Sequence, residues 1–451
     1  MTPFLFDDFD STTASAWKQK IQVDLKGVDY NDSLLWETAN GITVKPFYTK
    51  EDSKNQSINL PKKEFNICQT IFVDDEKIAN FLAIDALKRG ANAIQFTAKD
   101  TFDYPVLLKN INLKSTLLYF NFQFLNADFV LELSAYINQR NTFFQIDIIG
   151  NSAKTGNWFI SLKEDHLQLE KIAKNVSNPI NVNAILYQNS GATIVQQLAY
   201  TLAHANEYLN YFGAEIATKI HFSFAVGTNY FFEIAKLRAF RILWSTLLKE
   251  YDVKNSAVHI FTQPSLRNKT LYDYNVNLLR TTSECMSAIL GGSNTINNIS
   301  YDEIYHKSNE FGERIARNQL LILKEEGGFK EAQNFADGTY YIESLSQQFA
   351  EKALDIFKQI EKGGGFLNQL KEGTIQRKIN ESANKEQKEF DKNEITLVGS
   401  NLLSNKNDIM KGDLEIYPFI KQHTNKTKFP PIIQKRLSEK LEKERLEKEK
   451  I

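Results

Sequence analysis

The sequence predicts an α/β protein whose body is a (β/α)8 barrel of the TIM type. Two observations carry this prediction: short β-rich runs recur about eight times between residues 65 and 299, and helical stretches separate most of them. Strands that alternate with helices form parallel sheets with right-handed crossovers, and about eight such units can close on themselves. An open, doubly wound sheet is the alternative that the same alternation allows.

Length and composition fit one large barrel with extensions at both ends. The chain has 451 residues, of which 42% are hydrophobic, and its formal net charge is -1. A charge so close to zero gives no field for general nucleic-acid binding. The acidic start and the lack of a long apolar run argue against a signal peptide or a membrane span, so a soluble, cytoplasmic protein is expected.

The barrel is expected over residues 61–402, together with a helical part at its C-terminal end. Its strands are predicted at 65–72, 93–96, 117–122, 143–149, 182–187, 220–226, 258–261 and 295–299. Helices are predicted at 74–89, 192–212, 229–251 and 274–290, each with apolar residues at helical spacing. The first of them carries Ile78, Phe81, Leu82 and Ala86 on one side, and acidic residues at 74–76 cap its start.

Residues 1–60 are expected to form an N-terminal extension that acts as a partner-binding arm. Trp17, Ile21 and Leu25 lie four residues apart, which predicts one apolar stripe on a short helix that Gly27 ends. Residues 41–52 then predict an extended segment. A single apolar stripe needs a surface to cover, either its own barrel or another chain.

The C-terminal region is expected to be helical from 345 to about 392, with a glycine stop at 363–365 and a short strand at 395–401. Residues 403–451 form a tail that ends in a charged helix. Leu437 and Leu441 are thinly spaced among many charges there, which favours a solvated or frayed segment.

No cluster of residues with the spacing of a catalytic or metal site stands out. None of the six histidines forms an HxH, HxxH or HExxH pair, and the two cysteines, Cys68 and Cys285, form no CxxC. His221 and His259 lie in or beside strands, where a core or rim histidine is the favoured interpretation. Glu233 and Lys236 are three residues apart on a helix and are expected to pair at the surface.

Several segments nevertheless resemble the methylmalonyl-CoA mutase family. They are GTNYFFEIAKLRAFRILWSTLLKE (227–250), RNKTLYDYNVNLLRTTSECMSAILGGSNTI (267–296), FGERIARNQLLILKEE (311–326) and DGTYYIESLSQQFAEKALDIFKQIEKGGGF (337–366). Residues 23–52 are similar to the N-terminal arm of the family's small subunits. These segments are spread between residues 23 and 366 and follow one another in the family's order.

The departures from the family pattern concern catalysis. Catalytic chains of the family carry the run Tyr-His-Met-Gln-Glu-Ala-Gly-Ala after the fifth barrel strand, and its histidine meets the substrate. The matching run here is ILYQNSGA (185–192), which places Leu186 at the histidine position. No Asp-x-His-x-x-Gly motif of a cobalamin-binding domain occurs, so no such domain is expected, and neither are catalytic, cofactor-binding or metal-binding residues.

The resemblance therefore implies a small, non-catalytic subunit of a heterodimer. Its partner would be the large subunit of methylmalonyl-CoA mutase, which would hold adenosylcobalamin and interconvert (R)-methylmalonyl-CoA and succinyl-CoA by a radical rearrangement. Two alternatives stay open: a catalytic acyl-CoA mutase barrel that works with a separate cobalamin-binding chain, and a module that binds CoA thioesters without radical chemistry. Leu186 argues against the catalytic barrel, because that alternative requires the substrate histidine at this position.

Overall fold

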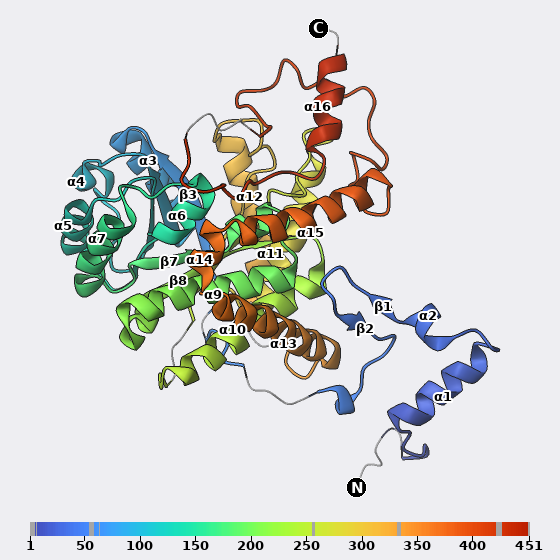
Figure 1. Cartoon of the computed structure of the whole chain (residues 1–451). Helices are drawn as coiled ribbons and strands as arrows, with labels where there is room; N and C mark the ends of the chain where they lie inside the picture. The colour runs from blue at the N-terminus through green and yellow to red at the C-terminus, as the bar shows by residue number, and fades with distance from the viewer. Residues whose placement is uncertain are drawn as a thin grey trace.

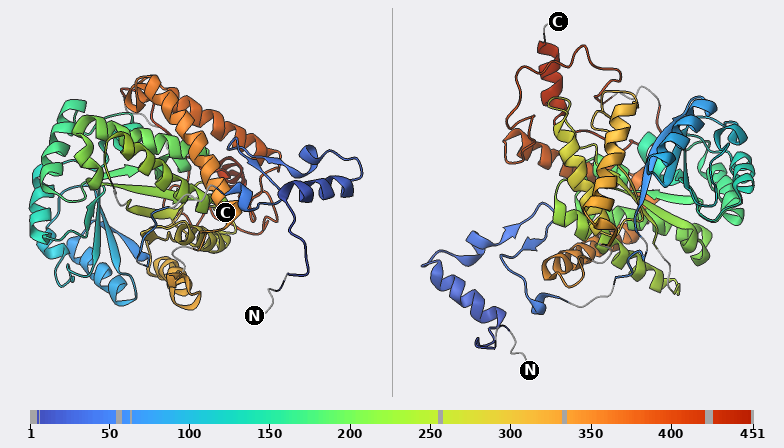
Figure 2. Two further views of the ribbon diagram at one scale, coloured as in Figure 1. Left: turned by 90° about the horizontal axis from the view of Figure 1, so that it is seen from below. Right: turned by 180° about the vertical axis from the view of Figure 1, so that it is seen from behind.

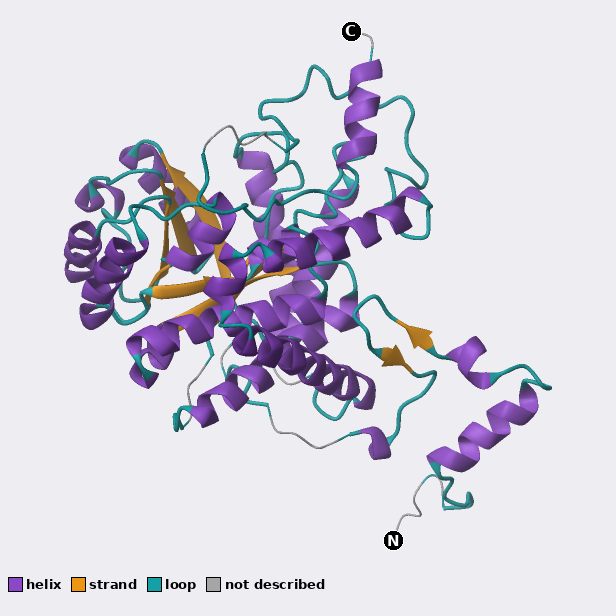
Figure 3. Ribbon diagram, viewed as in Figure 1, coloured by secondary structure: helices purple, strands orange, loops and turns teal. Residues whose placement is uncertain are grey.

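The computed structural model describes residue 5 and residues 7–53, 58–62, 64–254, 258–331, 335–420 and 426–449. Its centre is a ring of parallel strands covered on the outside by helices, and an N-terminal arm projects to one side (Figures 1 and 3). No helix within these ranges is both long and apolar enough to cross a lipid bilayer.

The barrel has eight strands, as the sequence predicts. The sheet runs in the order β6-β5-β4-β3-β10-β9-β8-β7, and a parallel bridge from Ile146 to Ile180 joins its two edges. Because this bridge closes the sheet into a ring, the open doubly wound alternative is wrong. The strands are β3 (Asn66–Val73), β4 (Ala93–Ala98), β5 (Leu117–Phe122), β6 (Thr142–Phe144), β7 (Ile180–Asn183), β8 (Ile220–Val226), β9 (Ile260–Pro264) and β10 (Thr295–Asn297).

Helices follow the strands and cover the outside of the ring, as Figure 2 shows from below and from behind. The four predicted helices are present as α3 (Glu76–Lys88), α9 (Ile194–Phe212), α10 (Tyr230–Glu250) and α11 (Val276–Leu290). The remaining units contain α4 (Tyr104–Leu107), α5 (Ala127–Ile137), α6 (Ile148–Thr155), α7 (Leu162–Asn175), α8 (Ile185–Asn189) and α12 (Glu310–Leu321).

Three predicted strand runs are largely or wholly non-strand in the structure, whereas several others differ only by one to three residues at their ends. The run 143–149 is strand only to Phe144, and α6 begins at Ile148. The run 182–187 likewise leaves the sheet at Asn183 and enters α8. Residues 395–401 form turns with a single bridge from Val398 to Leu402 instead of a strand. In the first two cases apolar residues continue from the strand into a buried helix with only single polar residues between them (Gln145, Asp147 and Asn183), and such a pattern alone does not separate strand from buried helix.

Helix α3 buries its alanines in place of most of the predicted apolar stripe, of which Ala86 alone is buried. Its buried residues are Ala79, Ala83 and Ala86, whereas Ile78 and Phe81 are 62% and 69% exposed. Small side chains allow the helix backbone to approach the sheet closely, so the alanines take the inner face. Asp75 caps the helix by accepting from the backbone N–H of Ile78, which confirms the predicted acidic start.

The arm is held to the barrel at its base and free at its tip. It consists of α1 (Ala14–Asp24), α2 (Tyr30–Leu34), a hairpin of β1 (Trp36–Glu37) and β2 (Thr43–Val44), and the 3-10 turn η1 (Lys50–Asp52). Within the hairpin, Ile42 is buried and Trp36 stacks on Phe232 of α10 at 5.5 Å. Helix α1 has no buried residue, and Figure 1 shows it well away from the barrel.

The C-terminal region packs across the barrel more tightly than its charge predicts. It contains α13 (Tyr340–Lys362), α14 (Phe366–Lys371), α15 (Thr374–Asp391) and α16 (Glu439–Lys448). Leu437, Glu439 and Glu442 are buried, so the prediction of a solvated or frayed tail is wrong for this segment. The reason is local pairing, since the carboxylate of Glu442 meets the buried guanidinium of Arg436.

Candidate functional site

The barrel axis is filled by aromatic side chains from opposite walls. Tyr119 of β5 lies 5.0 Å, ring to ring, from both Phe143 of β6 and Phe261 of β9. Three strands separate β5 from β9 in the sheet, so the contact between Tyr119 and Phe261 must cross the interior. We call Tyr119, Phe143, Phe261 and His259 the aromatic layer.

Two histidines belong to this interior, which confirms the core interpretation for both. His259 stacks on Phe143 at 4.1 Å and its Nε2 lies 2.8 Å from the hydroxyl of Tyr119. Burial, with the nearby charge of Arg241, lowers the pKa of His259 to about 3. Burial also lowers the pKa of His221 well below its usual value, and neither ring nitrogen of His221 has a partner in the described part of the chain. Both rings are therefore neutral near pH 7 and cannot supply a proton as imidazolium.

One cavity lies on each side of the aromatic layer. A cavity of about 1680 Å³ lies where the strands begin, and Phe143 and His259 line it. A second cavity of about 360 Å³ lies where the strands end, and Thr97, Asn121 and Asn297 are part of its wall. In barrels of this class the C-terminal ends of the strands are where active sites are built.

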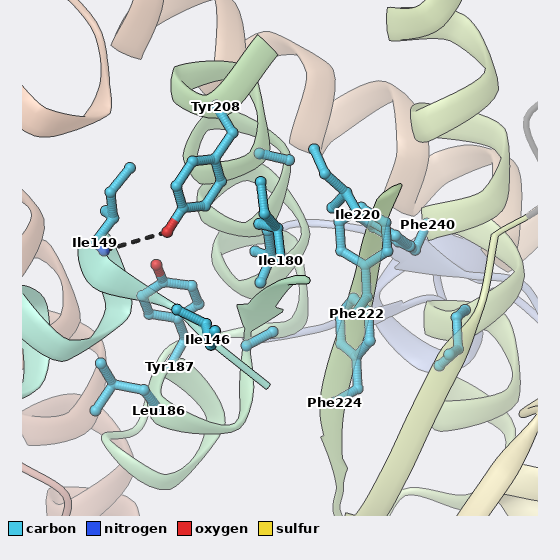
Figure 4. Close-up of a cluster of buried hydrophobic side chains, with 14 of the residues drawn as sticks. Ile146, Ile149, Ile180, Leu186, Tyr187, Tyr208, Ile220, Phe222, Phe224 and Phe240 are labelled. Carbon is cyan, nitrogen blue, oxygen red and sulfur yellow. Dashed lines mark hydrogen bonds between the residues drawn. The ribbon is translucent and has the colours of Figure 1, made fainter. Parts of the chain in front are cut away.

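Leu186 lies at this same C-terminal end, on α8 after the fifth barrel strand. It is 4% exposed and belongs to the main hydrophobic core, beside Tyr187 and Ile146 (Figure 4). The hydroxyl of Ser190 donates to the backbone carbonyl of Leu186 at 2.7 Å, which ties down the end of the short helix. A branched hydrocarbon side chain offers neither a donor nor an acceptor to a bound molecule.

A buried acid–histidine–tyrosine chain holds the surroundings of α8. Asp147 caps α6 and accepts from the Nε2 of His204 at 2.9 Å and from the hydroxyl of Tyr208 at 2.8 Å. The Nδ1 of His204 lies 3.0 Å from the hydroxyl of Tyr187. The order of groups resembles a nucleophilic triad, but Tyr187 and His204 are fully buried and cannot meet a substrate. Its role is to join the start of α6 to α8 and α9; Asp147 lies 57 positions from His204, so no local pattern signals the contact.

Asp147 is the charged acceptor at the centre of this hydrogen-bond network. Burial alone would raise its pKa, but His204 and the backbone N–H groups of Gly150 and Asn183 outweigh burial and lower it. A carboxyl with a lowered folded-state pKa stabilises the fold above its unfolded value of 3.8, and the contribution is lost as the pH falls through the folded value.

We predict that Asp147→Asn lowers the free energy of unfolding at pH 7 by about 2–3 kcal/mol, since hydrogen bonds to a charged acceptor are the stronger ones. The difference from the wild type should shrink as the pH falls below 3.8. Thermal melts between pH 3 and pH 7 measure it. Asp75→Asn is the matched control, because it changes an exposed helix cap in the same way and asparagine caps as well as aspartate. Equal losses in the two variants would contradict a special role for the buried network.

The pair Glu233 and Lys236 is buried, not at the surface as the sequence spacing suggests. Glu233 is 2% exposed and Lys236 is 0% exposed, and the two form an ion pair. The ammonium of Lys236 also donates to the carbonyl of Ala225 at 2.7 Å, to Gln197 at 3.2 Å and to Gln188 of α8 at 3.4 Å. Burial lowers the pKa of Lys236, and Glu233 opposes the shift. The pair therefore stabilises α8 through the bond from Lys236 to Gln188, and it does not lie on a solvent-exposed face of α10.

Residues 426–442 cross the end of the barrel on which α8 lies. The backbone N–H of Ile432 in this segment donates to the carbonyl of Ala153 in α6 at 2.8 Å. The segment then bonds to α8, through Lys435 to Asn189 at 3.0 Å, and to the loop after β9, through Leu437 to Arg267 at 2.8 Å. This crossing segment contacts α8 at Asn189, through the backbone of Lys435 and the side chain of Gln434.

A ring of eight parallel strands with helices on its outside defines the TIM-barrel class of fold. The family model described as methylmalonyl-CoA mutase matches residues 129–446. The methylmalonyl-CoA mutase small subunit of Porphyromonas gingivalis is 34% identical over an alignment of 430 residues, and the match covers 84% of this chain and 67% of that protein. The chain belongs to the methylmalonyl-CoA mutase family.

Other relatives match over a shorter part. The methylmalonyl-CoA mutase of Rhizobium meliloti is 37% identical over 234 residues, which are 50% of this chain and 33% of that protein. The large subunit of the Porphyromonas gingivalis enzyme is 32% identical over 233 residues, again 50% of this chain and 33% of that protein. The chain thus spans about a third of these longer relatives and two thirds of the small subunit.

Proposed function

We propose that this chain is the small, non-catalytic subunit of a heterodimeric methylmalonyl-CoA mutase. The observation that carries the proposal is Leu186. It stands where catalytic chains of the family place a substrate-contacting histidine, and it is buried in the hydrophobic core.

The surroundings of Leu186 support a barrel without a substrate path. The crossing segment contacts α8 at Asn189, and the aromatic layer fills the axis below the mouth. A CoA thioester in the barrel would need space that Tyr119 and Phe261 occupy. Filling the interior with large side chains is what a barrel released from catalysis permits, because closely packed apolar groups stabilise the fold.

The residues present do not fit the family's cofactor. Adenosylcobalamin supplies the radical chemistry of the family, and its domain would cap the mouth of the barrel. Here residues 426–442 lie across that mouth, and the sequence contains no Asp-x-His-x-x-Gly run. We therefore assign adenosylcobalamin to the large subunit and derive no step through it for this chain.

The partner in this proposal is a large subunit of the same family, in the cytoplasm. Small and large subunits occur together in Porphyromonas gingivalis, and both match this chain. Together they would interconvert (R)-methylmalonyl-CoA and succinyl-CoA. Helix α1 of the N-terminal arm has no buried residue, so it offers a surface that this chain's own barrel does not cover.

We predict that the purified chain alone shows no mutase turnover with adenosylcobalamin and methylmalonyl-CoA, and that Leu186→His does not create it. The new imidazole would lie among apolar groups without a partner, so we expect a loss of roughly 1–3 kcal/mol in stability instead. A coupled assay for succinyl-CoA and a thermal melt measure the two effects.

The decisive arm of this experiment pairs Leu186→His with a large subunit whose own substrate histidine has been replaced. Turnover by that complex would show that this barrel keeps a nearly complete site, and the non-catalytic assignment would then be abandoned. Turnover by the unpaired wild-type chain would favour the alternative of a catalytic barrel. The complex of wild-type chain and intact large subunit is the positive control.

A further inference from the structure

A histidine in the turn after β10 lies between carboxylates from two separate segments of the chain. His306 ends the turn at 301–306, and its Nδ1 lies 3.0 Å from the carboxylate of Asp302 in the same turn. Its Nε2 lies 3.4 Å from the carboxylate of Asp413. Asp413 belongs to residues 408–420, which we call the outer loop. The imidazole thus bridges the turn and the outer loop.

The protonation state of the imidazole decides whether both of these contacts are attractive. An ionised carboxylate only accepts hydrogen bonds, and a neutral imidazole has one N–H and one lone pair. The neutral ring can therefore donate to one carboxylate and must turn its lone pair toward the other. The imidazolium donates from both nitrogens, so the arrangement around His306 fits the charged ring.

The two carboxylates differ in how firmly they are held. The side chain of Asp302 is 2% exposed, and it also accepts from the amide of Asn309 at 2.8 Å. Asp302 lies in the same turn as His306 and stays beside it in either protonation state. The side chain of Asp413 is 51% exposed and lies in another segment, so its contact is the one that loss of the proton weakens.

Two more ionisable groups lie near the imidazole, and neither replaces the charge of His306. The ring of Tyr305 packs on it at 4.3 Å, and burial raises the pKa of this phenol, which is therefore neutral near pH 7. Glu415 of the outer loop accepts from the backbone N–H of Lys307 at 2.9 Å. Burial by itself would lower the pKa of His306, but its contacts with the two aspartates outweigh burial and raise the pKa above 6.5.

The backbone of the outer loop is bonded to the same turn. The N–H groups of Glu415 and Ile416 both donate to the carbonyl of Tyr305, at 2.9 Å and 3.0 Å. These bonds lie close in sequence to both partners of the ion pair, so the ion pair and the order of the loop are coupled. Further along the outer loop, the carbonyl of Pro418 accepts from Arg436 of the crossing segment at 3.1 Å.

We propose that His306 is a proton-operated latch that holds the outer loop against the turn at 301–306. As imidazolium it donates to Asp413 and the loop is held. As a neutral ring it presents a lone pair to that carboxylate, and the loop loosens around residues 413–416. The inference does not rest on the role of the chain in the mutase complex.

The sign of the pH dependence follows from the direction of the pKa shift. A histidine whose folded-state pKa lies above its unfolded value of 6.5 contributes its full stabilisation below that value. The contribution is lost as the pH rises through the folded-state pKa. The latch therefore releases on the alkaline side of pH 6.5.

Hydrogen–deuterium exchange of the full chain tests the latch, with mass spectrometry of outer-loop peptides at about pH 6 and about pH 8.5. Labelling times are scaled to the intrinsic exchange rate at each pH. We expect the protection of the amides of Glu415 and Ile416 to be about fivefold lower at the higher pH, which is the weight of a partly exposed ion pair. In NMR spectra, the imidazole signal that His306→Gln removes should titrate above pH 6.5.

Two variants of the outer loop form a matched pair. In Asp413→Asn the new amide can accept from the imidazolium or donate to the neutral ring, so protection should be equal at both pH values. Glu415→Gln removes a neighbouring carboxylate but keeps an acceptor for the N–H of Lys307, so the pH dependence should remain. His306→Gln should abolish the dependence as Asp413→Asn does. Circular dichroism shows that each variant is folded.

Three outcomes would overturn the proposal. They are equal protection of the wild-type loop at both pH values, a pH dependence that His306→Gln leaves in place, and a dependence that Glu415→Gln abolishes while Asp413→Asn keeps it.

Discussion

Removal of residues 1–28 is expected to release this chain from its large-subunit partner while leaving the barrel folded. Helix α1 and the residues around it present large apolar side chains to solvent: Phe9, Trp17, Val23 and Val28 are 73%, 51%, 73% and 59% exposed. A helix this short is marginal by itself, and burial against another surface is what makes such helices stable. Stable subunit interfaces are large and rich in apolar side chains.

The structure also shows where the cut should be made. The hairpin of β1 and β2 packs on the barrel through Ile42 and Trp36, and the side chain of Asn40 accepts from the backbone N–H of Ile194 at 2.8 Å. A deletion that stops at residue 28 keeps these contacts. Loss of the complex would therefore report on the arm and not on damage to the barrel.

Size-exclusion chromatography of the co-expressed chains measures the effect, and a titration gives the change in Kd. We expect the truncated chain to elute alone and Trp17→Ala to weaken the complex at least tenfold. Gln22→Ala changes an exposed polar residue of the same helix and is the control. If the truncated chain still elutes with the large subunit at unchanged affinity, the arm is not the anchor.

Lys236→Met is expected to destabilise the barrel by about 3–5 kcal/mol, because removing one partner of a buried ion pair leaves the other charge uncompensated. Glu233 would keep a carboxylate in the core, and the bonds from Lys236 to Ala225 and Gln188 would be lost as well. Urea unfolding followed by circular dichroism measures the change.

The chain provides a matched control for this variant. Lys378 and Glu381 on α15 are also three residues apart and paired at 2.7 Å, but their side chains are 52% and 53% exposed. Lys378→Met should cost well under 1 kcal/mol, as exposed pairs do. The double variant Glu233→Gln, Lys236→Met should recover much of the loss. Equal effects of Lys236→Met and Lys378→Met would show that burial of the first pair has no energetic weight.

The strands of the barrel could be predicted because most of their residues are buried on both faces, so that strands such as β5 and β8 are rich in apolar residues. Residues 117–122 and 220–226 match β5 and β8 at both ends. The end of a strand is not marked in the sequence where burial continues into a helix, as after Phe144, because strand and buried helix have similar compositions. The prediction is also wrong for the buried face of α3, where hydrophobicity marks Ile78 and Phe81 but close packing selects Ala79 and Ala83.

The polar contacts within the barrel could not be predicted from local sequence patterns. The spacing of Glu233 and Lys236 is the same on a wet helix as on a buried one, and only the fold shows that α10 is enclosed. Asp147 and His204 are 57 positions apart, and no residue near either points to the other. The position of Leu186 could be assigned only through the family resemblance, because a buried leucine carries no chemical signal of its own.

The contacts of the crossing segment with the loop after β9 can form only late in the synthesis of the chain. Arg436 donates to the carbonyl of Lys269 at 3.1 Å, and Glu442 accepts from the backbone N–H of Leu271 at 2.8 Å. Domains begin to fold from their N-terminal side while the ribosome is still extending the chain. All eight strands therefore emerge before the residues that satisfy the loop at 269–271. We expect the nascent barrel to expose this loop to water and to chaperones until elongation has passed Glu442.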